Sequence, residues 1–329
     1  MDYYIAWWNV ENLFARKNDP DRPEWLATRL AKELDGWTQA VVNRKISQLA
    51  GVIAQMNSGS GPDILGVCEI ENRAVLQQLV GAIGLSHRRY KIAHHNMRDK
   101  RGIDVAFIYD SRRVKTSESE WFDHVVLKRN ATRDLFQVNF YTRPGNRRLI
   151  CIGNHWPSRL GGVLQSEPYR ILAAETLSYW LERIKDLHAN DPVEPAVLVV
   201  GDFNDEPASR SLVEYALSER VATRVKSRRS TKPYLLNLMW PLMGQGVGTH
   251  YYEGLPGVLD QILVNRPLLR SESPLRVRTD SAEVLQLAEM RTTKGPKRFG
   301  RPSNTKSYDE TGFSDHYPIS VVVREDEGS

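Results

Sequence analysis

Residues 196–204 read AVLVVGDFN, an apolar run that ends in polar side chains. The run from Ala196 to Val200 predicts a buried strand that stops at a glycine. Because side chains alternate along a strand, Asp202 and Asn204 would leave its C-terminal end in the same direction. A carboxylate and a carboxamide side by side suit a site that holds a phosphate next to a hard cation. The stretch therefore predicts a strand end that contributes to such a site.

Polar residues also mark five further strand-like segments. These segments are WWNVEN at 7–12, ILGVCEIEN at 64–72, CIGNHWPS at 151–158, LDQILV at 259–264 and SDHYPI at 314–319. One acid or histidine at a strand end is usually a turn residue, a helix cap or a structural side chain. Six polar segments of this kind are much harder to explain in that way. Asp260 stands out, because a carboxylate within an apolar strand needs a partner such as a histidine or a cation.

The residue types of these segments indicate hydrolysis at phosphorus. Acids and amides without cysteine clusters suit a hard cation with oxygen ligands, Mg²⁺ or Mn²⁺, better than a structural zinc. Two histidines beside them can transfer protons near neutral pH. A cation offsets the charge of the phosphate while a base activates the attacking water. We therefore expect a metal-dependent phosphoester site.

Apolar periodicity predicts strands and helices that mix without strict alternation. The expected strands are 3–8, 63–68, 103–109, 135–140, 149–153, 196–200, 258–264 and 318–323, and the expected helices are 39–56, 73–83 and a long helix that Arg170 begins. The turn-forming RPGN at 143–146 predicts a hairpin, so the sheets should be partly antiparallel. We expect an α/β (α+β) fold in which two mixed sheets pack face to face with helices outside.

Composition limits the remaining choices. The 329 residues contain no Pro/Ser/Gly-rich linker and no repeat, and the polar segments extend from Asn9 to His316, so we expect one domain over 1–329. Cys68 and Cys151 lie in apolar runs without metal-type spacing and should be buried free thiols. The absence of a signal-peptide pattern or a membrane-length apolar run predicts a cytoplasmic monomer without a membrane partner.

The order and spacing of these segments resemble the endonuclease/exonuclease/phosphatase superfamily, which includes deoxyribonuclease I and the apurinic/apyrimidinic endonucleases. The resemblance covers nearly the whole chain, and GDFN at 201–204 and SDHYPI at 314–319 are its most specific parts. It implies a four-layer sandwich, with helices on both outer sides of two packed sheets and the site at one end of the sheets.

The resemblance also implies a metal site made of Asn9, Glu69 and Asp315. Glu69 would be the principal ligand of Mg²⁺, with Mn²⁺ or Ca²⁺ as alternative cations. Glu71 could share the face of Glu69, and we interpret it as a supporting residue.

The catalytic side chains follow in the same way. His155 would contact the scissile phosphate and assist the leaving oxygen. Asp202 and Asn204 would orient the attacking water and bind phosphate. Asp260 would orient His316, which is either the general base or a phosphate-contacting histidine. The resemblance leaves open which residue deprotonates the water.

The net charge of +5 and the sequence pI near 9.1 are compatible with a polyanionic partner. Basic residues form two clusters, Arg224, Lys226, Arg228, Arg229 and Lys232, and Arg291, Lys294, Lys297, Arg298, Arg301 and Lys306. They are either solvated loops or contacts to a phosphate backbone. The side chains expected to contact substrate are Arg98, Ser158, Arg170, Lys294, Lys297 and Arg298.

These clusters and the histidine at position 155 favour a nuclease that cleaves DNA or RNA. A phosphodiesterase or phosphatase that acts on lipid head groups or small phosphoesters is the alternative hypothesis. A catalytically inactive binding protein is the third. The segment THYY at 249–252 either lines the substrate groove or packs inside.

Overall fold

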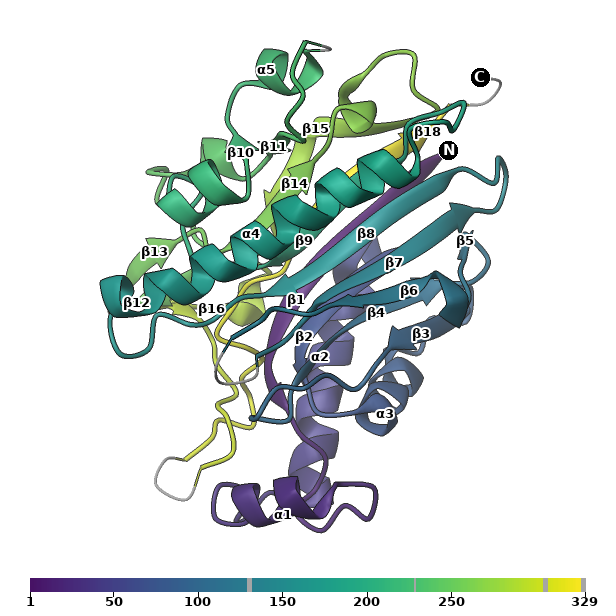
Figure 1. Ribbon diagram of the computed structural model, residues 1–329. Helices are drawn as coiled ribbons and strands as arrows, with labels where there is room; N and C mark the ends of the chain where they lie inside the picture. Colours follow the sequence, from purple (N-terminus) through teal and green to yellow (C-terminus); the bar gives the residue numbers. More distant parts are fainter. Residues whose placement is uncertain (129–131, 228, 304–306, 327–329) are drawn as a thin grey trace.

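Two β-sheets lie face to face at the centre of the computed structural model, which describes residues 1–128, 132–227, 229–303 and 307–326 (Figure 1). The first sheet consists, in spatial order, of β15 (Leu275–Val284), β18 (Ile319–Glu325), β1 (Asp2–Leu13), β2 (Ile64–Ile70), β4 (Asp104–Asp110) and β3 (Tyr90–His94). The second consists of β10 (Ser218–Glu219), β11 (Leu235–Asn237), β14 (Asp260–Val264), β9 (Ala196–Asp202), β8 (Arg148–His155), β7 (Leu135–Thr142) and β5 (Val114–Lys115), and β6 (Trp121–His124) also pairs with β7.

Both sheets are mixed, as expected. β1 pairs with β2 in parallel, and so does β8 with β9, whereas the other long strands pair antiparallel. The turn at 143–146 joins β7 to β8 as an antiparallel hairpin, which confirms that prediction. Two small hairpins lie outside the sheets, β12 (His250–Tyr252) with β13 (Leu255–Gly257) and β16 (Arg291–Thr292) with β17 (Gly295–Pro296).

Helices cover the outer faces of both sheets (Figure 1). The α-helices are α1 (Glu24–Leu30), α2 (Gln39–Gly59), α3 (Arg73–Ile83), α4 (Val163–Leu187) and α5 (Ala222–Lys226). The short elements are the 3₁₀ turns Glu118–Glu120, Trp240–Leu242, Pro267–Leu269 and Ala288–Met290 and the π turn Ser211–Tyr215. Within the described residues, every helix is too short or too polar to span a membrane.

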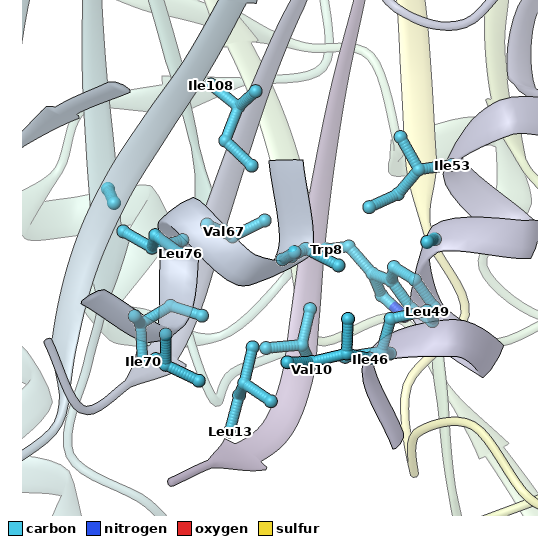
Figure 2. Close-up of a cluster of buried hydrophobic side chains, with 14 of the residues drawn as sticks. Trp8, Val10, Leu13, Ile46, Leu49, Ile53, Val67, Ile70, Leu76 and Ile108 are labelled. Atoms are coloured by element: carbon cyan, nitrogen blue, oxygen red, sulfur yellow. The ribbon is translucent and has the colours of Figure 1, made fainter. Parts of the chain in front are cut away.

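Strand alternation divides the apolar side chains among three cores. On β9, Leu198 and Val200 face the first sheet, whereas Val197 and Val199 face α4. The outer core of the first sheet packs Trp8 and Val67 against Leu49 and Ile53 of α2 (Figure 2). Full burial of one such aliphatic side chain stabilises the fold by about 1.5–3 kcal/mol. The four layers are therefore α2 and α3, the first sheet, the second sheet and α4, which confirms the predicted architecture.

Several boundaries differ from the predicted ones. α4 begins at Val163 after Gly162 and contains Pro168, so Arg170 lies inside the helix and does not begin it. β14 begins at Asp260, so this acid lies at the strand start and not within the strand. Cys68 and Cys151 are buried free thiols, as expected.

Candidate active site

Three neighbouring strands of the second sheet bring His155, Asp202 and Asp260 into one row. His155 is the register partner of Asp202 across β8 and β9, and Asp202 is the partner of Asp260 across β9 and β14. Each has the same alternation as the inward apolar residues of its strand, such as Val200 on β9 and Ile262 on β14. Paired residues lie on the same face of a sheet, so all three side chains point between the two sheets at one end.

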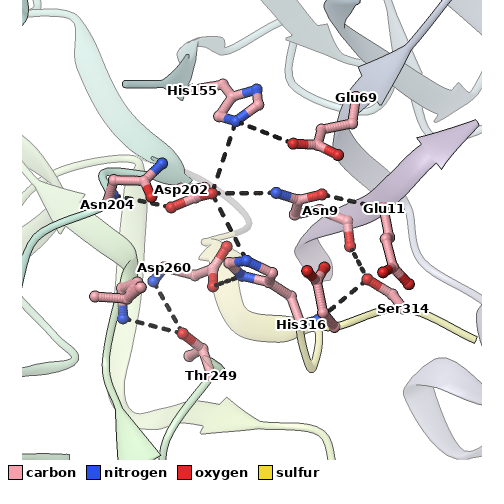
Figure 3. A network of polar contacts seen from close by, with 12 residues as sticks. Asn9, Glu11, Glu69, His155, Asp202, Asn204, Thr249, Asp260, Ser314 and His316 are labelled. Atoms are coloured by element: carbon pink, nitrogen blue, oxygen red, sulfur yellow. Dashed lines mark hydrogen bonds and ion pairs between the residues drawn. The ribbon is translucent and has the colours of Figure 1, made fainter. Parts of the chain in front are cut away.

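The first sheet contributes Asn9 and Glu69 to this end. Asn9 follows Trp7 on the inward face of β1, and its Nδ2 donates to Asp202 Oδ2 at 3.1 Å (Figure 3). Strict alternation would turn Glu69 outward with Val67. The pairing of β2 with β4 shifts register between Cys68 and Ile70, and Glu69 has a φ of +67°. This bulge turns the carboxylate inward, toward His155.

β9 extends through Gly201 to Asp202, and the chain turns directly after it, at Phe203 and Asn204. Gly201 lies against Asn154 of β8 so closely that a Cβ at position 201 would be 2.4 Å from the Asn154 Cβ. The backbone N–H of Asn204 donates to Asp202 Oδ1 at 2.9 Å, and Asn204 has a φ of +50°. Its Nδ2 donates to the carbonyl oxygen of Trp156 at 3.0 Å. Asp202 and Asn204 therefore lie next to each other, as predicted. The cause is an Asx-type turn, and not the strand alternation from which the prediction was made.

Asp260 has the partner that its burial requires. Its Oδ2 lies 2.7 Å from His316 Nδ1, and its Oδ1 accepts the indole N–H of Trp7 at 3.1 Å. Thr249 Oγ1 accepts the backbone N–H of Asp260 at 3.0 Å, which fixes the start of β14. Burial alone would lower the pKa of His316, but the carboxylates of Asp260 and Asp202 outweigh it and raise this pKa well above its usual value. His316 is therefore protonated near neutral pH, and Asp260 holds its ring in position.

His155 lies on the opposite side of Asp202. Its Nε2 is 3.5 Å from Glu69 Oε1 and 3.8 Å from Asp202 Oδ2, while its buried Nδ1 has no hydrogen-bond partner in the described residues. Arg133 fixes the backbone beneath it, donating to the carbonyl oxygens of His155 at 3.1 Å and Trp156 at 2.8 Å. Burial, and then the charge of Arg133, lower the pKa of His155 well below its usual value. This imidazole is neutral near pH 7, in contrast to His316.

The donor set fits a hard cation. Glu69 Oε2 accepts the N–H of Asn12 at 2.9 Å, and Oε1 faces the site. Burial raises the pKa of Asp202 to about 7; the charge of His316 lowers this pKa, and the neighbouring carboxylate of Asp260 offsets part of that lowering. A divalent cation would offset this charge, and carboxylate and amide oxygens are the ligands that Mg²⁺ prefers.

Two groups of described side chains bring possible ligand atoms within 4.8 Å of one another. They are Asp202 with Asp260 and His316, and His250 with Asp315 and His316. His250 forms an isolated β-bridge with His316, and their rings lie 4.8 Å apart between centroids. Burial, followed by the charge of His316, lowers the pKa of His250 to about 4, so this ring is also neutral near pH 7.

Arg298 lies over the carboxylates beside the site. Its Nη2 is 2.7 Å from Glu11 Oε1 and 3.2 Å from Asp315 Oδ2, and 57% of its side chain is exposed. Burial and then the charge of Asp315 raise the pKa of Glu11 to about 7. Beneath it, the fully buried Lys45 donates from Nζ to the Glu11 carbonyl oxygen and lies 5.0 Å from the Phe299 ring centroid. A guanidinium here neutralises acids that would otherwise repel a substrate phosphate.

The structure brings together all eight residues predicted for catalysis and metal binding, namely Asn9, Glu69, His155, Asp202, Asn204, Asp260, Asp315 and His316. Glu71 is not among them. It pairs with Arg22 at 2.5 Å and accepts the N–H of Ala15 at 2.6 Å, so its role is to tie the β1 and β2 ends together.

The predicted substrate contacts divide into two groups. Arg98 and Ser158 are exposed, and Ser158 lines a groove beside His155. Arg170 is wrong as a substrate contact: it is fully buried and its Nε lies 2.7 Å from Asp205 Oδ2. Arg170 supports the loop that carries Asn204, because it pairs with the next residue, Asp205. Arg159 binds the same carboxylate and also donates to the Asn204 carbonyl oxygen.

The two basic clusters lie in different parts of the molecule. Lys294 is exposed in the β16–β17 hairpin, which packs on β12 through Gly295 and Tyr251, and Lys297 is half-buried. The first cluster lies around α5, where Val225 and Ser227 line a small cavity with the C-terminal part of α4. Arg228 and Lys306 lie outside the described residues.

The sequence interpretation gave no role to Trp7 and Glu11 and did not name Arg133, and it left open whether the segment that contains His250 lines the groove. Trp7 lies two residues before Asn9, so alternation was a usable signal for it, whereas Glu11 has a φ of +51° in the part of β1 where the register shifts. Arg133 reaches the site through long-range packing, for which a single sequence carries no local signal, whereas His250, beside His316, belongs to the THYY segment that was expected either to line the groove or to pack inside.

Solved structures of several other proteins share this fold. A structure of an endonuclease/exonuclease/phosphatase family protein from Bacteroides thetaiotaomicron is 15% identical with a TM-score of 0.57, covering 99% of both chains. The human Nocturnin catalytic domain with bound sulfate is 17% identical with a TM-score of 0.57, covering 99% of this chain and 95% of that one. A mannosyl-6-phosphatase from Bacteroides thetaiotaomicron is 16% identical with a TM-score of 0.57, covering 98% and 99%.

At these identities the likeness shows a shared fold. A search of curated protein sequences gave no match. The family model described as Endonuclease/Exonuclease/phosphatase family matches residues 4–325, which contain every side chain of the row and of the bulge at Glu69. The chain therefore belongs to the endonuclease/exonuclease/phosphatase family of hydrolases that act on phosphoester bonds.

Proposed function

We propose that this protein is a divalent-metal-dependent phosphodiester hydrolase that cleaves DNA or RNA. One observation carries the proposal: the Asp260–His316 pair, joined at 2.7 Å, faces the buried carboxylate of Asp202 at 3.8 Å from His316 Nε2. The cationic imidazole of His316 can donate a hydrogen bond to a phosphate, and the carboxylate of Asp202, with its raised pKa, can accept a proton from water.

Each side chain then has a distinct part in the reaction. Asp260, which accepts the indole N–H of Trp7, holds His316 so that Nε2 faces the scissile phosphate as a hydrogen-bond donor. Asp202 accepts the proton of the attacking water, since its pKa of about 7 suits a base near neutral pH. His155, a neutral imidazole near pH 7, contacts the phosphate on the other side, and the imidazolium of His316 gives the leaving oxygen its proton.

Glu69, Asn9 and Asp315 would hold the cation. A bound Mg²⁺ or Mn²⁺ supplies charge neutralisation at the phosphate when it is present. Asn9 also fixes the orientation of Asp202 through its 3.1 Å hydrogen bond, so it joins the metal site to the base. Ca²⁺ has oxygen ligands too, but its larger and more flexible coordination is less suited to this role.

Three observations favour a nucleic acid over a small phosphoester. The chain carries a net charge of +5, and an exposed Arg298 lies over the carboxylates of the site. Basic side chains line a groove that begins next to His155. The similar structures also include a mannosyl-6-phosphatase, so a phosphatase acting on a small phosphoester is the second candidate.

The experiment compares four substrates in Mg²⁺ and in EDTA: supercoiled plasmid, RNA, a phosphoinositide and bis(p-nitrophenyl) phosphate. We expect cleavage of a nucleic acid that requires Mg²⁺ and falls steeply with salt. Glu69→Gln should lose activity, whereas the matched variant Glu71→Gln should keep the specific activity of its folded fraction. Release of a head group with intact nucleic acid would favour the second candidate, and no turnover with any metal would favour an inactive binding protein.

We also propose that residues 1–329 form a single domain. The inter-sheet core, which includes Tyr3 and Val323, supports one folding unit. The buried free thiols of Cys68 and Cys151 support a reducing compartment such as the cytoplasm.

A further inference from the structure

A groove of about 720 Å³ begins next to the candidate active site and extends along the start of α4. It starts at Pro157 and Ser158, directly after the segment that carries His155. Arg133 lines the groove and also donates to the carbonyl oxygens of His155 and Trp156, so the two sites share one fixed backbone.

The lining of this groove is strongly basic. Its described charged residues are Arg29, Lys100, Arg101, Lys128, Arg133 and Asp99. Asp99 is the single acid among them. Its carboxylate forms ion pairs with two guanidiniums, that of Arg133 at 3.1 Å and that of Arg101 at 3.7 Å. Burial, and then the charge of Arg133, lower the pKa of Lys128, which shows that neighbouring cations here repel one another. The groove therefore has an excess of positive charge that an anion would offset.

The start of α4 adds a second source of positive potential. Gly161 and Gly162, with φ of +89° and +117°, turn the chain into a helix of 25 residues. No described side chain caps this helix start and its first turn contains no acid. Gly161, Gln165 and Ser166 line the groove, so the positive end of the helix dipole lies against it.

An unpartnered hydroxyl points to a ligand independently of the charges. Thr132 lines the same groove and is 4% exposed, and its Oγ1 has no hydrogen-bond partner within the described part of the chain. Buried hydroxyl groups nearly always have a partner, because an unsatisfied one is costly. A phosphate oxygen can accept from a threonine hydroxyl, from backbone N–H groups and from guanidiniums together.

We propose that this groove is a second phosphate subsite, which binds a non-scissile phosphate of a nucleic-acid substrate while the neighbouring phosphate lies at His155 and His316. The subsite rests on the proposed hydrolase function and makes it more specific. Arg101, Lys128 and Thr132 bind the phosphate, and the helix start completes the cradle. Simple esters with one phosphate leave the groove without a ligand.

The groove fits a nucleotide chain because it combines cations with an exposed ring. Lys128 Nζ lies 4.3 Å from the centroid of Tyr169, whose side chain is 40% exposed. Aromatic faces next to basic side chains are the pattern on which single-stranded nucleic acids stack and pair their phosphates. The adjoining Leu160 is 90% exposed and adds apolar surface for a base.

The first experiment compares a dinucleoside monophosphate with the same molecule carrying an added terminal phosphate at either end. For the wild type we expect the added phosphate at one end to raise kcat/KM at least 10-fold. In the double variant Arg101→Gln/Lys128→Gln the gain should fall below 3-fold. The matched variant Arg183→Gln/Lys185→Gln removes two charges from the C-terminal part of α4 and should keep the full gain.

The second experiment measures binding of inorganic phosphate in EDTA by calorimetry, so it needs no turnover. Arg101→Gln/Lys128→Gln and Thr132→Val should each weaken binding, the double variant at least 10-fold. Equal binding by wild type and double variant, or an equal kcat/KM with and without the terminal phosphate, overturns the subsite. A gain seen with a phosphorylated inositol head group and not with nucleotides overturns the nucleic-acid assignment. Weakened phosphate binding in a protein without turnover supports the subsite and overturns the hydrolase function.

Discussion

The two ends of β2 and β4 use charged residues in opposite ways. At one end, which we name the closed end, Asp63 and Asp110 are paired with Arg88 and Arg113 at distances between 2.5 and 3.2 Å. At the other end, Glu69 on the same β2 faces a neutral histidine, and the nearby Asp202 and Asp260 share one imidazolium. The closed end satisfies its charges within the fold, and the site end leaves negative charge for a cation to offset.

The largest expected effect separates activity from stability at these two ends. Asp202→Asn should lower kcat about 10³-fold or more, because it removes the proposed base while the geometry stays. Its free energy of unfolding should stay the same or rise, since a buried carboxylate with a raised pKa is lost. Steady-state kinetics and urea unfolding in the same buffer measure both quantities.

Asp63→Asn supplies the opposite case and the control. Removing this carboxylate leaves Arg88 and Arg113 with fewer partners, so the unfolding free energy should fall by about 3 kcal/mol while kcat stays within about 3-fold. Comparable losses of kcat in Asp63→Asn and Asp202→Asn would show that the two ends do not differ as argued.

A smaller effect compares two arginines on either side of the molecule. Arg88 is 7% exposed at its side chain, contacts both Asp63 and Asp110, and donates to the Gly61 carbonyl oxygen at 2.7 Å. Arg88→Gln should therefore cost about 3 kcal/mol of unfolding free energy, because it leaves buried carboxylates unpaired.

Arg298→Gln should cost less than about 1 kcal/mol, since 57% of the Arg298 side chain is exposed and water screens its charge, although Glu11 is buried. Glu11 can also take up a proton, because its pKa is already raised to about 7. Chemical unfolding of both variants tests the difference. A loss for Arg298→Gln as large as that for Arg88→Gln would mean that the site end is held together as tightly as the closed end.

The last comparison of the two ends concerns the pH dependence of stability in EDTA. Burial raises the folded-state pKa of Asp202 from 3.8 to about 7, so the folded protein binds more protons than the unfolded chain between these values. Stability from this group is fully present below about pH 4 and is lost as the pH rises through about 7. His316, whose pKa is also raised, adds loss in the same direction above its usual value.

Urea unfolding at pH 5 and pH 8 measures this slope. The wild type should lose on the order of 1–3 kcal/mol more than Asp202→Asn over this interval, and Mg²⁺ should remove most of the difference. Parallel pH profiles for the two proteins would indicate that Asp202 is not the strained charge of the site end.

Much of the fold followed from apolar periodicity. The prediction was right where a strand is buried and alternates, as in 196–200, and where a helix has one apolar face, as in 73–83. It failed for β15, whose sequence LRVRTDSAEV exposes many polar side chains at the sheet edge. Short strands such as β3 depend on their neighbours for pairing and carry too few residues for a periodic signal.

The residues of the site could be predicted from the order of the polar strand ends. The backbone geometry that places them could not. The apolar surroundings of Asp260 in the sequence predicted a partner for it, because a buried carboxylate requires one. That partner is His316. The turn at Asn204 and the bulge at Glu69 depend on left-handed backbone that periodicity does not encode. The basic groove joins segments around 29, 100, 128 and 165, which only long-range packing brings together.

The left-handed backbone at Glu69 has a consequence for engineering this protein. At a φ of +67°, glycine or asparagine suits the chain better than glutamate. The residue that the backbone prefers and the residue that the chemistry requires are therefore different. A library screened for heat resistance alone would drift away from glutamate at this position, whereas a library screened for turnover would retain it.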